Sequence, residues 1–365
     1  MINIQEQERV QRHLAFWNRD KIDRPMIGFQ IGTYFFADRF KAARKLMVPG
    51  KEIKPTDIHV DDFLSDYEKL YQQITQVEQD AFWTACPFIS VPWFEAILGC
   101  KVKALKSSMA SEPYLKDLNH LENLFSEKGN LWLDKFLEFT EKLVELSQDR
   151  FPVGQPIMRG LSDTMGALRG YSNFVLDFYD YPEESKKILK KIKETFMYVM
   201  SRHQKILKEY HGGYSVALFN QWAPGKCFYI QEDLSNLLSP NIYRKYIYDL
   251  NKMTCEDENY DYCTFHIHAA SFFILDDLLK IDNIKAYEIT KDVGGPSIKE
   301  MLPQLKKILN SKRLILWGDL NQEDLDIILD NLSYKGLYLH IVSESVTKAK
   351  QLMDYIKNKS AKSNR

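Results

Sequence analysis

Two histidines that stand two residues apart give the strongest chemical signal in the sequence. The run Tyr262-Cys-Thr-Phe-His-Ile-His-Ala is rich in β-branched and aromatic residues, so it is typical of a β-strand. Side chains alternate between the two faces of a strand, and His266 and His268 therefore share one face. Two imidazoles at this spacing near a strand end are a common metal-binding arrangement. We predict a metal site here, although a lone strand histidine more often has a structural role.

One further histidine and two carboxylates lie on other predicted strands. His340 is the candidate third ligand, because it stands in the last strand-like run of the chain. Glu288 lies between apolar neighbours, where an unpaired carboxylate is costly to bury, so it acts in catalysis or in a structural ion pair. Asp319 is the second candidate catalytic residue, and it equally suits the cap of a helix that begins near Asn321.

Two segments that mix aromatic and polar side chains are predicted to be loops that lie over the site. They span residues 91–100 and 220–233, and the second directly follows a predicted strand. Packing in the core explains the tryptophans as well as a site role does, and Asp233 also suits a helix cap. The candidate substrate-binding residues are Trp93, Trp222, Tyr229, Gln231, Asp233 and Arg159.

The elements that must position these residues alternate between strands and helices. The last four strand-like runs begin about 22 to 29 residues apart, the length of one βα unit, and they are apolar on both faces. The predicted strands are Pro25–Ile31, Phe88–Trp93, Phe151–Met158, Gly213–Phe219, Tyr262–Ala269, Ile284–Thr290, Arg313–Asp319 and Gly336–Val342. Eight strands favour an α/β fold of the (β/α)8 TIM barrel type with N-terminal helical additions. A doubly wound sheet is the competitor, but no Gly-rich phosphate loop follows any of the strands.

Length and composition indicate an ordinary globular enzyme-sized chain. The 365 residues are 45% hydrophobic and 27% charged, with a net charge of -1, so neither disorder nor nucleic-acid binding is expected. We predict a single domain over residues 1–365, with a helical extension over 1–22 and a frayed tail over 357–365. Five scattered cysteines, a polar N-terminus and no long apolar run predict a cytoplasmic protein without membrane contact.

Several motifs, taken in order, resemble the uroporphyrinogen decarboxylase-like superfamily. They are Asp23-Arg-Pro, Gly166-Ala-Leu-Arg-Gly-Tyr, Phe174-Val-Leu-Asp-Phe-Tyr-Asp-Tyr-Pro-Glu and Gln231-Glu-Asp-Leu-Ser-Asn-Leu-Leu-Ser-Pro, followed by the His266 strand and the closing strand at Gly336. The resemblance runs from about residue 20 to about residue 355. It implies a (β/α)8 barrel, in agreement with the strand pattern.

The resemblance is closer to one branch of that superfamily than to the other. The porphyrinogen decarboxylases hold substrate carboxylates with an Arg-Gln-Ala-Gly-Arg-type segment, whereas the matching stretch here, Gly28-Phe-Gln-Ile-Gly-Thr-Tyr, has no arginine. The cobalamin-dependent methyltransferases bind zinc through a His-x-Cys pair and a later cysteine. Here His266 and His268 stand at the pair and no cysteine follows Gly336, so His340 or Glu344 would complete the site.

These observations favour a corrinoid-linked methyltransferase and leave two alternatives open. In the favoured hypothesis, the methyl donor is a small methylated substrate or a corrinoid carried by a partner protein, and the acceptor is a thiol or a folate. A metal assists the transfer, and the resemblance implies that this metal is zinc. The first alternative is a metal-free decarboxylase of a small acid, with Arg24, Arg159 or Arg169 binding the carboxylate. The second is a non-catalytic barrel that binds a corrinoid or another ligand. Neither the methyl donor nor the oligomeric state follows from the sequence.

Overall fold

Six parallel strands form the central sheet, and helices pack outside them. The computed structural model describes residues 4–118, 121 and 124–363. In their order across the sheet the strands are β1 (Met26–Ile31), β11 (Leu337–Ser343), β10 (Arg313–Gly318), β9 (Ile284–Thr290), β8 (Tyr262–Ile267) and β7 (Cys227–Gln231). Nearly all of their residues are buried, as expected for strands covered on both faces. The prediction of an α/β fold is confirmed.

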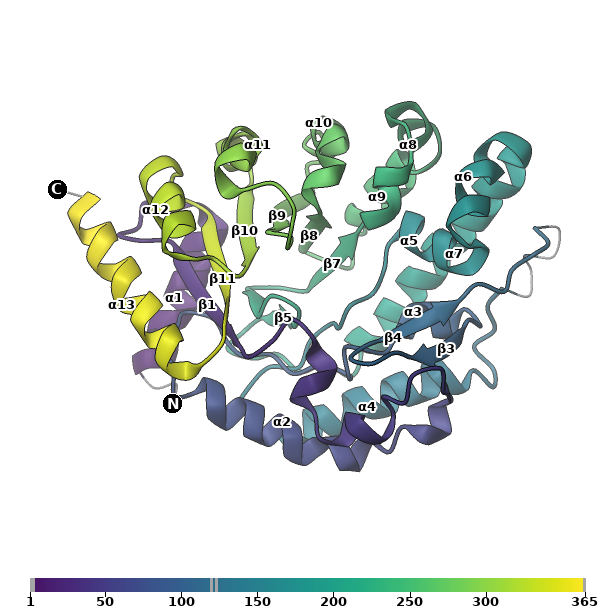
Figure 1. Ribbon diagram of the computed structural model, residues 1–365, viewed down its shortest axis with the longest axis horizontal. Helices are drawn as coiled ribbons and strands as arrows, with labels where there is room; N and C mark the ends of the chain where they lie inside the picture. Colours follow the sequence, from purple (N-terminus) through teal and green to yellow (C-terminus); the bar gives the residue numbers. More distant parts are fainter. Residues whose placement is uncertain (1–3, 119–120, 122–123, 364–365) are drawn as a thin grey trace.

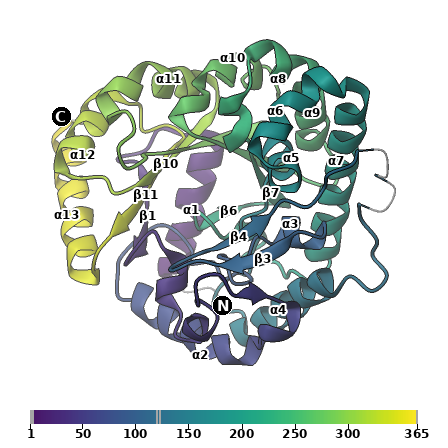
Figure 2. The same cartoon turned by 45° about the vertical axis from the view of Figure 1, so that its right-hand side comes forward.

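The helices form an arc around the outside of the strands (Figure 1) and enclose them when the molecule is turned (Figure 2). They are α1 (Ile4–Asn18), α2 (Val60–Ile74), α3 (Trp93–Ile97), α4 (Leu131–Ser147), α5 (Leu161–Arg169), α6 (Tyr171–Asp180), α7 (Pro182–Gln204), α8 (Pro240–Tyr246), α9 (Tyr248–Cys255), α10 (Leu275–Leu278), α11 (Ile298–Ser311), α12 (Gln322–Asn331) and α13 (Val346–Ser363). Short 3-10 helices are η1 (Phe36–Arg39), η2 (Ala42–Lys45), η3 (Pro55–Asp57), η5 (Asp233–Leu237) and η6 (Ala269–Ile274).

Two small antiparallel sheets complete the set of elements. One contains β2 (Glu52–Ile53), β3 (Lys101–Ala104) and β4 (Met109–Glu112), and the other is the hairpin of β5 (Tyr214–Val216) and β6 (Gln221–Ala223). The hairpin packs against α1, where the Trp17 indole donates a hydrogen bond of 2.8 Å to the Trp222 carbonyl. Trp17 also packs on Tyr262, the first residue of β8, so this contact lies at the amino ends of the strands.

The second half of the chain follows its sequence pattern closely. β9 has its predicted bounds, and α12 begins beside Asn321 as predicted, because the strand and helix periods are unbroken there and the helix carries a start signal. Capping boxes open α11 at Ser297 with Glu300 and α12 at Asn321 with Asp324. The described residues therefore repeat a βα unit from β8 to α13.

The first half departs from the predicted pattern, and the departures have physical causes. Residues 88–93 form no strand, and residues 151–158 contribute only isolated bridges through Val153 and Gln155. Pro87, Pro92, Pro152 and Pro156 remove backbone donors from these two segments, so a regular ladder cannot form. Of the eight predicted strands, the described residues place five in this sheet; residues 213–219 instead contribute β5 to the hairpin, and the sixth strand of the sheet, β7, was not predicted.

Two further expectations need correction. Residues 220–233 are not one loop, since they contain β6 and β7. The C-terminal tail is helical as far as Ser363, and Lys357 pairs with Glu78 at 2.6 Å; residues 364–365 lie outside the described residues. Within the described part of the chain, no helix combines the length and the apolar character needed to cross a bilayer.

Candidate metal centre

Three neighbouring strands bring the polar residues of the site together at their carboxyl ends. Gln231 on β7 pairs in register with His266 on β8, and His266 pairs with Glu288 on β9. His268 follows β8 directly, and Asp233 begins η5 just after β7. The parallel ladder therefore sets the spacing of the site, because residues in register on adjacent strands lie side by side.

Asp233, His266 and His268 point one ligand atom each at a common point. The Nε2 atom of His266 lies 3.2 Å from Asp233 Oδ1 and 3.2 Å from His268 Nε2, and His268 Nε2 lies 3.7 Å from Asp233 Oδ1. A tetrahedral ion with metal–ligand bonds of about 2.0–2.1 Å separates its ligands by about 3.3 Å. The three separations therefore fit one shared transition-metal ion.

Each histidine of this triad is held from behind by a carboxylate. Glu288 bonds to Nδ1 of His266, and Asp292 lies 2.8 Å from Nδ1 of His268. A carboxylate on Nδ1 fixes the ring and leaves the Nε2 lone pair free for a metal. Burial alone would lower the pKa of His266, but the carboxylates of Glu288 and Asp233 raise it well above its ordinary value.

Asp233, the third ligand, lies in a segment that is held by hydrogen bonds to its backbone and side chains. Asp163 accepts hydrogen bonds from the backbone N–H groups of Asp233 and Leu234, at 2.9 and 3.2 Å. Gln231 donates to the other carboxylate oxygen of Asp233 at 2.8 Å. The buried Glu232 accepts from two N–H groups at the start of α5, and burial raises its pKa to about 7. The ligand oxygen is thus positioned before any ion arrives.

The negative charge of the site and an oxygen atom without a donor both favour a cation at this point. Three carboxylates surround two imidazoles, so the site carries a formal charge of -3 when both rings are neutral. Asp233 Oδ1 is buried and receives no well-directed hydrogen bond from the described residues. The side chain of His266 is only 6% exposed, whereas those of Asp233 and His268 are 30% and 29% exposed, so a ligand has an open side. The residues fit a divalent transition metal.

His340, the expected third ligand, lies outside this triad. It is almost fully buried, and its Nε2 lies 3.2 Å from the side-chain nitrogen of Asn220. Burial lowers its pKa to about 3, since none of the described carboxylates acts on it. Asp233, which the sequence suggested as a substrate contact or helix cap, takes the place that we expected for His340.

The three aromatic candidates are fully buried. Trp93 packs between α3 and α4, and its indole donates to the Phe88 carbonyl at 3.1 Å. Trp222 lies at the amino ends of the strands and donates to the Tyr210 carbonyl at 2.7 Å. The phenol of Tyr229 is fully buried and accepts from the Met158 N–H at 3.1 Å. The two tryptophans are packed as the packing alternative describes, whereas burial and the nearby Asp233 carboxylate both raise the pKa of Tyr229.

The arginines of the decarboxylase alternative are mostly engaged in buried ion pairs. Arg24 pairs with Asp80 through two hydrogen bonds of 2.5 and 2.8 Å. Arg169 pairs with Asp177 through two hydrogen bonds of 2.6 and 2.8 Å. Such two-point pairs leave little donor capacity for a substrate carboxylate.

Arg159 is the more accessible of the three arginines. It lies 2.9 Å from the buried Glu95, and both line a cavity of about 180 Å³ beside Tyr34 and Phe36. Asp233 is among the carboxylates that raise the pKa of Arg159, after Glu95 as the largest cause. Arg159 therefore remains a candidate for substrate contact near the triad.

The two candidate catalytic carboxylates occupy different environments. Glu288 is fully buried behind His266, so it positions the ring and does not face the open side of the triad. Asp319 is exposed and lines a groove with Asn321, Glu344 and Lys348. The cap of α12 is Asn321 itself, so Asp319 does not cap that helix.

Asp292 and Asp163 were not identified from the sequence. Asp292 follows β9 by two residues. Its position just beyond the carboxyl end of a strand is a signal for a site residue, because barrel sites are built from strand ends and the loops that follow them. Asp163 stands in the first turn of α5, far in sequence from the loop that it holds. No local pattern points to it.

The whole chain is similar in fold to a known enzyme. A methyltransferase from Methanosarcina mazei superposes with a TM-score of 0.63, at 14% sequence identity, over 96% of this chain and 98% of that chain. No protein-family model and no curated protein sequence matches the chain. At this identity the likeness establishes a shared fold.

Proposed function

We propose that this protein is a corrinoid-linked methyltransferase of the uroporphyrinogen decarboxylase-like superfamily. It would move a methyl group between a methylated corrinoid or small substrate and a thiol or folate acceptor, with the corrinoid carried by a partner protein. The triad of Asp233, His266 and His268 is the observation that carries the proposal. The fold shared with a methyltransferase and the motif order along the chain support it.

We further propose that the fold is a barrel, in which two irregular segments take the places of two regular strands. Ala85 bridges Val153 in parallel fashion, and Gln155 exchanges hydrogen bonds of 2.8 and 2.9 Å with the backbone of Tyr229 on β7. These contacts link β1 and β7, the two edges of the six-stranded sheet, through residues 80–86 and 153–155. The Asp80 N–H donates to the Ile27 carbonyl of β1 at 2.8 Å, which supplies the last link.

Asp233, His266 and His268 would hold the metal, which we propose to be zinc. When bound, such an ion acts as a Lewis acid that lowers the pKa of an acceptor thiol. Glu288 and Asp292 keep the two rings in the tautomer with protonated Nδ1. Arg159 and Glu95 line the neighbouring cavity, where they would orient a polar group of the substrate.

Metal content is the measurement that tests this proposal first. Elemental analysis of protein purified without chelator should find about one zinc per chain, and a His266→Ala/His268→Ala double variant should contain none. A chelator should abolish methyl transfer from methylcobalamin to a thiol, and added zinc should restore it. Because two histidines and a carboxylate also suit iron, the analysis must include iron.

Each outcome of that analysis leads to a definite conclusion. Wild-type protein without metal would overturn the metal-assisted mechanism. Iron in place of zinc would keep the site and overturn thiol activation by zinc. Zinc without transfer from any corrinoid would favour the non-catalytic binding protein. The decarboxylase alternative finds little support, because Arg24 and Arg169 are engaged in buried ion pairs.

A further inference from the structure

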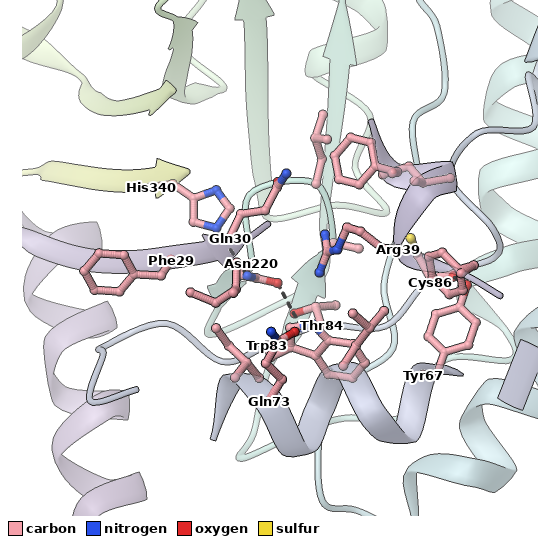
Figure 3. A pocket seen from close by; sticks show the side chains of 18 residues that line it. Phe29, Gln30, Arg39, Tyr67, Gln73, Trp83, Thr84, Cys86, Asn220 and His340 are labelled. Atoms are coloured by element: carbon pink, nitrogen blue, oxygen red, sulfur yellow. Dashed lines mark hydrogen bonds between the residues drawn. The ribbon is translucent and has the colours of Figure 1, made fainter. Parts of the chain in front are cut away.

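A second polar cavity lies beside β1, separate from the triad. It has a volume of about 60 Å³ and is enclosed by β1, η1, α2, residues 83–89 and the turn at 217–220 (Figure 3). A site of that volume has room for on the order of four water molecules, or for one small organic anion. Phe219 separates the two sites: its ring stacks on His266, while its neighbours Leu218 and Asn220 line the cavity.

The charge inside this cavity is one-sided. Of the described residues that line it, Arg39 is the only lysine or arginine, and none is Asp or Glu. Nε of Arg39 is buried and has no hydrogen-bond partner among the described residues. Burial lowers the pKa of Arg39 to about 10, and the groups that oppose this are only the Cys86 thiol and the Tyr67 phenol. The Arg39 side chain is half-buried and pairs with no carboxylate among the described residues, so its guanidinium can accept an anionic partner.

His340 lines the same cavity and is its second polar group with an unused ring nitrogen. The Thr84 N–H donates to Oδ1 of Asn220 at 2.9 Å, which turns the amide nitrogen of Asn220 toward Nε2 of His340. Nε2 must therefore accept, and the proton of the neutral ring resides on Nδ1. Nδ1 is buried and without a partner among the described residues. In Figure 3, His340 and Arg39 approach the cavity from opposite sides.

We propose that this cavity binds the carboxylate of a small organic acid between Arg39 and His340. A carboxylate supplies acceptors for the guanidinium and for the imidazole N–H. Phe29, Phe36 and Ile74 provide apolar surface for a short carbon chain. The guanidinium also stacks over Phe36 at 5.9 Å, which orients it. The site does not depend on methyl transfer or on the metal.

Titration calorimetry with acetate, propionate and butyrate tests the proposal. Wild-type protein should bind at least one of these acids saturably, and Arg39→Met should weaken its binding on the order of tenfold or more, because a charge-assisted pair is lost. Arg39→Lys should retain part of the binding, since it keeps the charge and loses the two-point geometry. The control is Arg44→Met, which removes an exposed arginine from the neighbouring η2 and should leave binding unchanged.

Further binding measurements distinguish this site from other places where an anion could bind. The His266→Ala/His268→Ala variant should bind the acid as wild type does; loss of binding there would place the carboxylate on the metal and overturn the proposal. Equal binding of inorganic phosphate or sulfate would overturn the carboxylate assignment. Binding that survives Arg39→Met, or no saturable binding by wild-type protein, would overturn the site itself.

Folding of the variants is a separate readout. Arg39→Met should melt within a few degrees of ligand-free wild type, because the arginine is half-buried and no carboxylate among the described residues pairs with it. Propionate should raise the melting temperature of wild type and of Arg44→Met but not that of Arg39→Met. If Arg39→Met fails to fold, Arg39→Lys supplies the decisive comparison, and full retention of binding affinity by it would contradict the two-point geometry.

Discussion

Two buried polar regions stand on either side of Phe219, and they have opposite charges. The triad region contains Asp233, Glu288 and Asp292 around two imidazoles. The β1 cavity contains the guanidinium of Arg39, and none of its described lining residues is a carboxylate. One region therefore favours a cation and the other an anion, although both are built from histidines on strands of the same sheet.

What differs between the histidines of the two regions is the group behind each ring. His266 has a carboxylate on Nδ1, and its pKa is raised despite burial. His340 has an amide on Nε2, and burial lowers its pKa to about 3. Histidine type and strand position thus do not decide which ring becomes a ligand. The second partner of the ring decides it, and that partner comes from another strand.

Replacing Asp233, the third ligand of the triad, should cause the largest loss of zinc affinity. Asp233→Asn removes the charged oxygen from the triad but keeps the shape of the side chain. Zinc affinity should fall by more than roughly 100-fold, which is the upper loss expected when a hydrogen-bond partner of a ligand is removed. His340→Gln should leave zinc affinity within about twofold, because His340 lies outside the triad. Competition with a coloured chelator measures both affinities. Equal losses in the two variants would show that His340 is a ligand after all.

Removing the carboxylate behind His266 should have the next largest effect. Glu288→Gln retains a hydrogen-bonding group but not the negative charge, so metal affinity should fall about 10- to 100-fold. Thr290 donates to Glu288 at 3.2 Å and helps to hold either side chain in place. Asp292→Asn is the matched variant on His268. A Glu288→Gln protein with wild-type zinc affinity would mean that Glu288 has only a packing role.

Part of this contrast could be predicted from the sequence. The period of two placed His266 and His268 on one face, and the apolar run around Glu288 marked a carboxylate that needs a partner. The bounds of β9 and the start of α12 were predicted as they occur, because both elements have an unbroken period and clear ends. Local signals therefore specified the scaffold of the second half and two of the three triad members.

The rest depends on contacts between residues far apart in the chain. Asp163 holds Asp233 from 70 residues away, and Asn220 reaches His340 from 120 residues away. The period of a strand fixes which face a side chain takes, but not which strand or loop lies opposite. The strand predictions for residues 88–93 and 151–158 were wrong for a related reason, because proline leaves these segments only contacts such as the bridge of Ala85 to Val153.

A buried histidine without a carboxylate should make the fold sensitive to acid. Burial lowers the pKa of His203 to about 3, and neither ring nitrogen has a hydrogen-bond partner among the described residues. Between pH 6.5 and pH 3 the unfolded chain binds the extra proton, so this residue costs stability as the pH falls. At pH 5 the cost is about 2 kcal/mol, on the order of thirtyfold in the folding equilibrium.

His203→Leu should remove that part of the acid sensitivity. Urea unfolding at pH 7 and pH 5 should show a loss of stability smaller by about 2 kcal/mol in the variant than in wild type. The stacking of His203 on Phe136, at 5.0 Å, is lost at both pH values and so cancels in the difference. His59→Gln removes an exposed imidazole and is the control. An unchanged loss in His203→Leu would mean that the ring is charged in the folded protein.

Asp319 should show the smallest effect, because it is neither a member of the triad nor a lining residue of the cavity beside β1. It is exposed, Tyr34 bonds to its backbone N–H, and its carbonyl accepts from Lys291 at 3.0 Å. Backbone contacts survive a side-chain change, so Asp319→Asn should keep zinc affinity and acid binding within about twofold of wild type; steady-state kinetics should likewise show kcat within about twofold. Asp319→Ala is the companion variant, which also removes the hydrogen-bonding group. A fall of more than tenfold in kcat with unchanged KM in both variants would instead place Asp319 in proton transfer, and would extend the acidic region across the end of β10.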